Sequence, residues 1–318
     1  MARLGRLMIV AGLTLFVGLG AVAVMAAVLL TRLDARLDRM PDVFASLGHD
    51  RPADTAESTF LIHVVDSQSG PAAAAQTGRP DGTVLIAHVA ESGPKATIVA
   101  LPSHAPSTAV GTAADSGTRP HLGHLVATVE EITALHVDHV AVLDLAALPT
   151  LVDAIGGVDL PLPDSKAYSD TPARQGFVRV GGAQALAWMR GGSGGPARVD
   201  RDRTHRRLVV LSALVHAQHQ ETLLNPPALD RLLSALAASV RVDETLGTGE
   251  VWQLAGRLAW LRSEDVRFVT APPLVAEPVS SSAHADERWA ALWTAVRSES
   301  LAAYLRQHPE DRFRWWAR

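Results

Sequence analysis

The densest group of charged side chains in this chain of 318 residues is the segment RVDRDRTHRR, which runs from Arg198 to Arg207. If this segment is helical, Arg203, Arg206 and Arg207 are three and four residues apart and share one face. Guanidinium groups this close repel one another unless water, neighbouring carboxylates or a bound anion offsets their charge. Because a planar guanidinium matches two phosphate oxygens at once, the spacing is typical either of a solvated helix or of a phosphate site.

The position of this cluster supports the phosphate interpretation. A glycine-rich loop at 191–197 precedes a helix that we expect from Asp200 to His219, with Asp200 as its N-cap. The first turn of a helix has backbone N–H groups without intrahelical partners, and these groups attract anions. The arginines would face an anion from the same end of the helix, and a solvated helix remains the alternative.

Two carboxylates lie at the ends of predicted strands. Asp66 follows the strand Phe60–Val65, and Asp81 precedes the strand Thr83–Val89. Carboxylates in such places often cap turns. If adjacent strands bring the two together, they would instead suit Mg²⁺, which binds one or two carboxylates together with waters and phosphate oxygens.

The elements that must position these residues alternate between strand-length and helix-length segments. Further strands are expected at Ala96–Leu101, 137–143, Val158–Leu162 and Val266–Thr270. Helices are expected at Leu122–Leu135, Leu145–Ile155, Ala183–Met189, 227–240 and 248–262. The alternation predicts an α/β fold with a central mixed β-sheet covered by helices on both faces.

The N-terminal segment Leu7–Leu30 carries no charge over a length that crosses a bilayer as a helix. We interpret it as one transmembrane signal anchor; the alternative is a cleaved secretory signal, whose apolar part is usually shorter. Basic residues on both sides leave the orientation open by charge alone. The short tail at 1–6 and the lack of a second long apolar segment favour a cytoplasmic tail and an extracytoplasmic body.

The rest of the chain divides by composition. We expect a stalk or linker over 31–58, an extracytoplasmic domain over 59–273, and a linker with a last helix over 274–318. The protein would then be a single-pass protein of the cell membrane.

Composition and motifs exclude several kinds of function. A formal net charge of −4 argues against a nucleic-acid partner. The chain has no cysteine, so its domain needs no disulfides. We find no Walker phosphate loop, no zinc-ligand spacing and no G-x-S-x-G motif. The chemistry therefore has to come from carboxylates and arginines.

The order of segments resembles the LytR-CpsA-Psr family of bacterial cell-envelope proteins. The resemblance covers about 59–216 and rests on VVDSQS, GRPDGTVLIAHV, GGAQALAWMRGG and VDRDRTHRRL. Its most specific parts are the run from Thr128 to Pro161 and the G-x-Q-A-L-A-x-x-R segment that ends at Arg190. The resemblance implies a membrane-anchored phosphotransferase that moves a phosphoglycan from a polyprenyl pyrophosphate carrier onto peptidoglycan or a related acceptor, with Mg²⁺ at the pyrophosphate.

The resemblance also implies roles for individual residues. Asp66 and Asp81 match the two positions that bind the metal, and Arg79 matches the arginine of the same motif as Asp81. The pyrophosphate-binding and catalytic arginines correspond to Arg190, Arg203 and Arg206. An apolar pocket between the sheet and the helices would take the prenyl chain.

Several family positions hold other residues here: Gln68 for an arginine, Ser103 and His104 for the end of a P-R-D motif, Gly191-Gly192 for a second arginine, and Arg207 for a glutamine. Arg207 and His104 are expected to replace part of the lost contacts, so Arg207 joins the expected substrate-binding residues. Because each lost charge contact weakens the stabilisation of a transferring phosphoryl group, the alternative is a catalytically impaired envelope protein that acts as a lipid-binding scaffold or sensor.

Overall fold

A computed structural model describes residues 27–48, 50–55, 57–68, 82–91, 93, 95–101, 119–161, 177–191, 196–217, 225–258, 261–272 and 282–313. Two predicted site residues, Arg79 and Asp81, lie outside these ranges, as does most of the predicted span Leu7–Leu30. Among the helices that are described, none has both the length and the apolar character needed to cross a bilayer.

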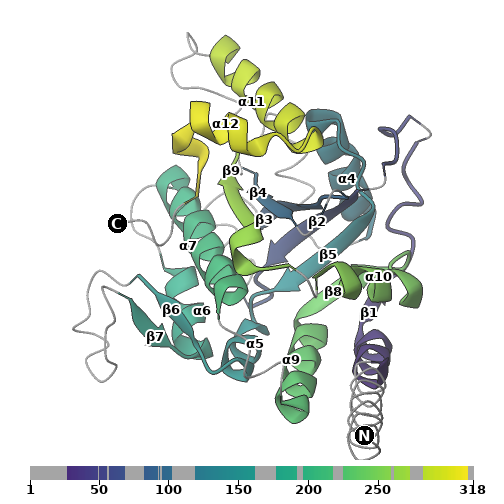
Figure 1. The fold of residues 1–318 in the computed structure, drawn as a ribbon, viewed down its shortest axis with the longest axis vertical. Helices are drawn as coiled ribbons and strands as arrows, with labels where there is room; N and C mark the ends of the chain where they lie inside the picture. The colour runs from purple at the N-terminus through teal and green to yellow at the C-terminus, as the bar shows by residue number, and fades with distance from the viewer. Residues whose placement is uncertain are drawn as a thin grey trace, which may run out of the picture.

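A seven-stranded mixed sheet forms the centre of the fold (Figure 1). In chain order its strands are β1 (Asp38–Met40), β2 (Ser58–Val65), β3 (Thr83–Val89), β4 (Ala96–Ala100), β5 (His139–Asp144), β8 (Val240–Asp243) and β9 (Val266–Thr270). Their order across the sheet is β1-β8-β5-β2-β3-β4-β9. Since β2 and β5 are parallel neighbours, their carboxyl ends lie at the same edge of the sheet.

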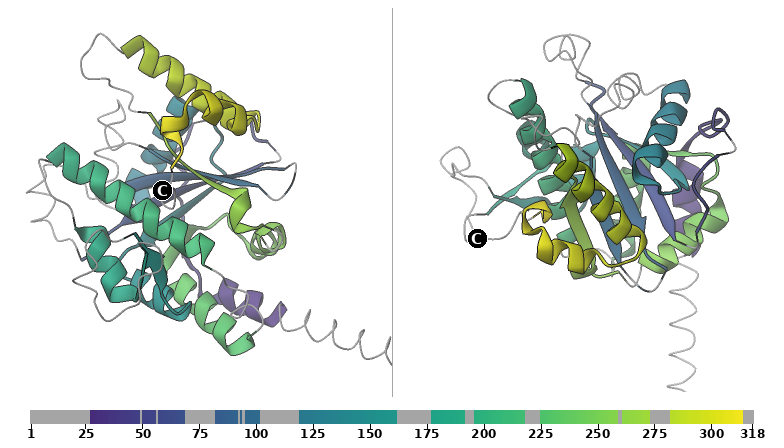
Figure 2. Two further views of the ribbon diagram at one scale, coloured as in Figure 1. Left: turned by 60° about the vertical axis from the view of Figure 1, so that its left-hand side comes forward. Right: turned by 90° about the horizontal axis from the view of Figure 1, so that it is seen from above.

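Helices cover both faces of this sheet, as predicted (Figure 2). One face carries α4 (Arg119–Thr133), α11 (Ser282–Arg297) and α12 (Leu301–Gln307), and the other carries α5 (Leu148–Ala154), α6 (Gly182–Arg190) and α7 (Pro196–His216). Two further helices, α9 (Pro226–Ser239) and α10 (Thr248–Leu258), flank β8, and short 3-10 helices occupy Ser263–Asp265 and Pro309–Asp311.

Each face of the sheet has its own apolar cluster, because successive side chains of a strand point to opposite sides. Leu61 packs in the cluster beneath α4 and α11, whereas Val64 packs in the cluster beneath α5, α6 and α7. In α4 the apolar positions predicted at helical spacing, Leu125 and Val129 among them, are fully buried. Burial of one such side chain contributes about 1.5–3 kcal/mol.

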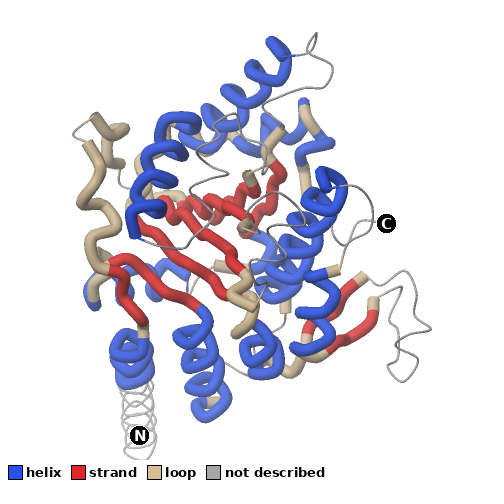
Figure 3. The backbone as a smooth tube through the Cα atoms, turned by 180° about the vertical axis from the view of Figure 1, so that it is seen from behind, coloured by secondary structure: helices blue, strands red, loops and turns tan. Residues whose placement is uncertain are grey.

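The hairpin that follows α5 departs from the prediction. Val158–Leu162 was expected to be the next strand of the domain, but β6 (Val158–Leu160) pairs only with β7 (Val178–Val180), in a separate two-stranded sheet (Figure 3). Gly157 precedes β6 with φ of +95°, and a Cβ at this position would lie 2.8 Å from the Val180 carbonyl oxygen. The glycine therefore turns the chain away from the central sheet.

Part of the segment expected as a stalk belongs to the folded domain. Within 31–58, β1 pairs in parallel with β8, and Val43 is fully buried in the cluster beneath α4. Arg51 donates through Nε and Nη2 to the buried carboxylate of Glu130, with 2.7 Å from Nη2 to Oε1. These contacts hold the segment against α4.

The helix formed by residues 27–36 packs beside α9. Leu29 and Leu33 are buried, and Arg32 and Arg36, on the same face, both approach Asp230, at 3.7 and 3.5 Å. Spacings of three and four residues place these four side chains on one side of the helix. The continuation of the predicted anchor is therefore docked on the domain.

The C-terminal segment contributes two helices to the core. The last helix expected within 274–318 divides into α11 and α12 at a turn where Glu299 has a φ of +51°. Trp289 and Trp293 pack edge to face, with ring centroids 5.6 Å apart, in the cluster beneath α4. Both side chains are buried, so this part of the chain completes the core.

His63 is a polar residue at the centre of an apolar region. It lies on β2 between Val84 of β3 and Val142 of β5, and its side chain points to the same face as Leu61. Neither ring nitrogen has a hydrogen-bond partner among the described residues. Burial, with smaller contributions from the charges of Arg207 and Arg241, lowers the pKa of His63 to about 4.

This burial predicts a specific pH dependence of stability. The unfolded chain binds a proton at His63 below about pH 6.5, and the folded chain binds it only near pH 4, so stability falls as the pH drops through this window, by about 3 kcal/mol. We expect His63→Leu to reduce this loss and to keep full stability at pH 7. Urea unfolding of the full chain in detergent at pH 7.0 and 4.5 measures both effects, and an equal loss in both proteins would contradict the assignment.

Candidate functional site

The predicted site begins where β2 and β5 end. Asp66 follows β2, and Asp144 is the last residue of β5, at the same edge of the sheet. The Asp144 carboxylate accepts hydrogen bonds from the backbone N–H groups of Ser67 (3.3 Å) and Ala146 (2.9 Å). Asp144 thus fixes the turns after both strands and, with them, the position of Asp66.

The Asp66 carboxylate forms a two-point ion pair with Arg190. Arg190 donates from Nε to Oδ2 and from Nη2 to Oδ1, each at 2.7 Å, and the Gln68 N–H donates to Oδ1 at 3.2 Å. The Asp66 side chain is 1 % exposed, whereas the Arg190 side chain is 34 % exposed. The structure therefore brings together a predicted metal ligand and a predicted phosphate ligand.

The placement of Arg190 depends on a close approach between α6 and α5. Arg190 is the last residue of α6, and Gly182 is the first. A Cβ at Gly182 would overlap the backbone of Pro149 in α5, and the Gly182 N–H donates to Asp153 at 2.7 Å. Only glycine allows this approach, which sets the direction in which α6 carries Arg190 to Asp66.

Arg206 of α7 contacts the end of α6. Its Nη1 donates to the Trp188 carbonyl oxygen at 2.9 Å, and its guanidinium carbon lies 5.2 Å from the centroid of the Trp188 ring. A Cβ at Gly191 would come within 2.6 Å of the same Nη1. The guanidinium is therefore held by the Trp188 carbonyl and ring, in space that is open only because residue 191 has no Cβ.

The side chain of Arg207, a residue of α7, contacts the start of β3. It is buried, and its Nη1 donates to the Thr83 hydroxyl at 2.7 Å. Thr83 pairs with Val64, near the end of β2. Arg207 therefore brings positive charge to the edge that carries Asp66.

The start of α7 corrects one expectation. The helix begins at Pro196, one turn before the N-cap expected at Asp200, and proline is well suited to a first helical position. Arg203 is half-buried in the second turn, and Arg206 and Arg207 follow in the next. The first-turn N–H groups therefore do not lie beside these arginines, and the anion interpretation rests on the guanidinium groups.

Not all of the residues singled out in the sequence belong to the described part of the chain. Arg79 and Asp81, like Ser103 and His104, are outside it. Among the rest, the structure joins Asp66 to Arg190 directly and places Arg206 against the helix that carries Arg190.

Comparison with known proteins gives the family. A model of the LytR_cpsA_psr family matches residues 41–287. The chain belongs to the LytR-CpsA-Psr family. LcpB of Corynebacterium glutamicum, described as a probable cell wall biosynthesis protein, is 30% identical over 295 residues, which cover 86% of this chain and 66% of LcpB. The chain therefore matches just under two thirds of the length of this relative.

Solved structures of LytR-CpsA-Psr proteins share the fold. A LytR-Csp2A-Psr enzyme from Actinomyces oris superposes with a TM-score of 0.53 at 18% identity, covering 80% of this chain and 96% of the other. TagT bound to LI-WTA gives a TM-score of 0.52 at 15% identity, with coverage of 76% and 90%. At these identities the likeness establishes the mixed α/β fold.

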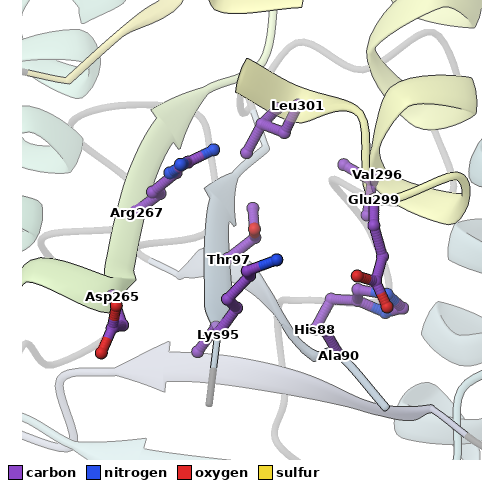
Figure 4. A pocket seen from close by; sticks show the side chains of 10 residues that line it. His88, Ala90, Lys95, Thr97, Asp265, Arg267, Val296, Glu299 and Leu301 are labelled. Carbon is purple, nitrogen blue, oxygen red and sulfur yellow. The ribbon is translucent and has the colours of Figure 1, made fainter. Parts of the chain in front are cut away.

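A pocket elsewhere on this LytR-CpsA-Psr domain is distinct from the candidate site. Lys95 and Arg267 line one side of it, and His88 and Glu299 line the other (Figure 4). His88 Nε2 lies 3.2 Å from a Glu57 carboxylate oxygen, and burial, with the charges of Glu299 and Glu91, raises the pKa of Glu57. The pocket lies at the end of β3 opposite Thr83, so none of the predicted site residues lines it.

Two residues of the site escape prediction from sequence. Trp188 is recognisable only as an aromatic residue two positions before Arg190, and its contact with Arg206 joins two separate helices. In the sequence Thr83 is only the first residue of a predicted strand, and nothing there indicates its contact with Arg207. Neither forms a local motif with its partner.

A side chain at Gly191 would displace the Arg206 guanidinium, so substitution of Gly191 tests whether the position of Arg206 matters. Gly191 has φ of −64°, so Gly191→Ala strains no backbone but pushes the guanidinium off Trp188. We expect binding of inorganic pyrophosphate to weaken about tenfold, the loss of one charge-assisted contact, with little change in stability.

Gly256→Ala is the matched control, since a Cβ there meets nothing within 4 Å. Isothermal titration calorimetry on the parent and both variants provides the affinities. Equal affinity in all three proteins would show that Arg206 does not need this position to bind the anion.

Proposed function

We propose that this protein is a phosphotransferase that moves a phosphoglycan from a polyprenyl pyrophosphate carrier onto peptidoglycan or a related cell-wall acceptor. Leu7–Leu30 would anchor it as a single-pass protein, with the large domain outside the membrane. Membership of the LytR-CpsA-Psr family and the cell-wall role in the name of LcpB support this proposal.

The single observation that carries the proposal is the convergence of charge at one edge of the sheet. Asp66, Arg190 and the pair Arg206-Arg207 come from three separate parts of the chain. Their contacts join α6 and α7 to the sheet where β2 ends and β3 begins. A phosphoryl group in transfer spreads negative charge over its oxygens, and fixed cations lower the barrier because they need no reorganisation.

In this proposal Arg190, Arg203 and Arg206 act on the reacting pyrophosphate. The Arg190 side chain is partly exposed, so its guanidinium can contact an incoming anion. Arg79 and Arg207 complete the proposed substrate-binding residues. The described residues on both faces of the sheet pack into apolar clusters. An apolar pocket for the prenyl chain between the sheet and the helices stays a prediction.

The donor chemistry of the site fits Mg²⁺. Asp66 supplies hard carboxylate oxygens beside the arginines, and Asp81 is the second proposed ligand. When bound, the ion would neutralise charge on the pyrophosphate oxygens. Asp66 already accepts hydrogen bonds from Arg190 and from the Gln68 N–H, so it can serve the ion only if some of these contacts change.

A second candidate function is a lipid-binding scaffold or sensor that lacks catalysis. The observation that favours it is Gln68, which stands where the family has an arginine. Its side-chain oxygen accepts a hydrogen bond from Arg190 at 3.3 Å and adds no positive charge to the site.

Substitution of charged site residues separates the two functions. In cells that lack the protein, we expect Asp81→Asn and Arg203→Ala to fail to restore glycopolymer attachment and to lower transfer by about 10²–10³-fold in a purified assay with Mg²⁺ and a polyprenyl pyrophosphate-linked glycan. A scaffold would tolerate both changes.

Arg262→Ala is the matched control, because Arg262 is 78 % exposed and pairs with Glu264 away from the site. It should transfer glycan as the parent does. Inert parent protein under conditions in which a relative is active would refute the enzymatic proposal, and full complementation by both site variants would favour the scaffold.

A further inference from the structure

The contact between Asp66 and Arg190 has a consequence for cation binding. Arg190 takes up both oxygens of the carboxylate, with two N–H···O bonds of 2.7 Å in the parallel arrangement that makes such pairs strong. The same carboxylate is a proposed ligand of the metal ion. A guanidinium and a divalent cation therefore compete for one buried acceptor.

Burial of Asp66 increases the cost of separating its carboxylate from a cation. The Asp66 side chain is 1 % exposed, and a buried carboxylate without a cation is strongly disfavoured. In this structure Arg190 supplies the positive charge that offsets the burial of the Asp66 carboxylate. Because Arg190 is attached to the chain, it competes at a constant effective concentration.

Arg190 is also placed to leave Asp66. A third of its side chain is exposed, and it sits at the end of α6, before the glycine-rich segment at 191–195. The Gln68 side-chain oxygen accepts a hydrogen bond from the same Nη2 at 3.3 Å, so Arg190 has a second polar partner beside Asp66. A pyrophosphate offers Arg190 several anionic oxygens as alternative partners for the same two-point contact.

We propose that Arg190 is a built-in competitor of the metal ion at Asp66, so that the cation binds weakly until a pyrophosphate draws the guanidinium away. The inference rests on the proposed function, since it assumes that a metal ion and a pyrophosphate share this site. Its consequence is positive coupling: each ligand raises the affinity of the other, because the binding of one removes the cost of separating Arg190 from Asp66.

The test measures cation affinity without turnover. The full chain in detergent is titrated with Mn²⁺ alone, as a stand-in for Mg²⁺ that is visible by electron paramagnetic resonance. We expect Arg190→Gln to bind Mn²⁺ about tenfold or more tightly than the parent, because Asp66 loses its internal partner. The double variant Asp66→Asn/Arg190→Gln should lose this gain.

Arg206→Gln is the matched control for charge. It removes the same positive charge from the same region, but the contacts of Arg206 described above are to the Trp188 carbonyl and ring and involve no carboxylate. A clearly larger gain in Arg190→Gln than in Arg206→Gln supports the proposal. Equal gains, or weaker binding in Arg190→Gln, would overturn it.

A third variant covers the case in which Arg190→Gln does not fold. Arg190→Lys keeps the charge but cannot form the two-point contact, so it should still bind Mn²⁺ more tightly than Arg206→Gln. No gain in Arg190→Lys overturns the proposal. Glycan transfer by the parent protein is a separate measurement, so the proposed function and this inference can fail independently.

Discussion

A buried carboxylate is costly unless charges or hydrogen bonds compensate it, and much of the site geometry follows from the way Arg190 does this for Asp66. The parallel pairing of β2 with β5 delivers Asp66 to the edge of the sheet, and Asp144 fixes the turn that follows. Arg190 meets the requirement from α6, whose approach depends on Gly182 lying against Pro149. A change in any of these contacts would move the charge on which the proposed chemistry depends.

Sequence periodicity predicts most of the sheet and its helices because these are determined by local burial patterns. β3 and β9 match the predicted strands residue for residue, and the apolar face of α4 is buried as its spacing indicates. β1 and β8 are three and four residues long, which is too short for an alternating pattern to be visible in the sequence. They are defined by their pairing in the sheet, where β8 lies between β1 and β5.

Prediction of the site was limited for a different reason. The identities of Asp66, Arg190 and Arg206 followed from motifs, but their contacts depend on how two helices meet the sheet edge. Nothing in the spacing shows that Arg190 would pair with Asp66, or that Trp188 would hold Arg206. Arg207 stood out in the sequence as one of a cluster of arginines, but its burial against Thr83 of β3 depends on how α7 packs on the sheet.

The pairing of β1 with β8 sets a limit on how the domain can be separated from its membrane-proximal residues. Removal of everything before residue 59, which composition alone suggests, would strip away the outermost strand and leave the backbone donors and acceptors of β8 exposed along one side. Such an open strand recruits other chains and promotes aggregation. A soluble fragment that retains residues from 27 onward keeps that strand covered, together with the buried Val43 and the Arg51 contact to Glu130.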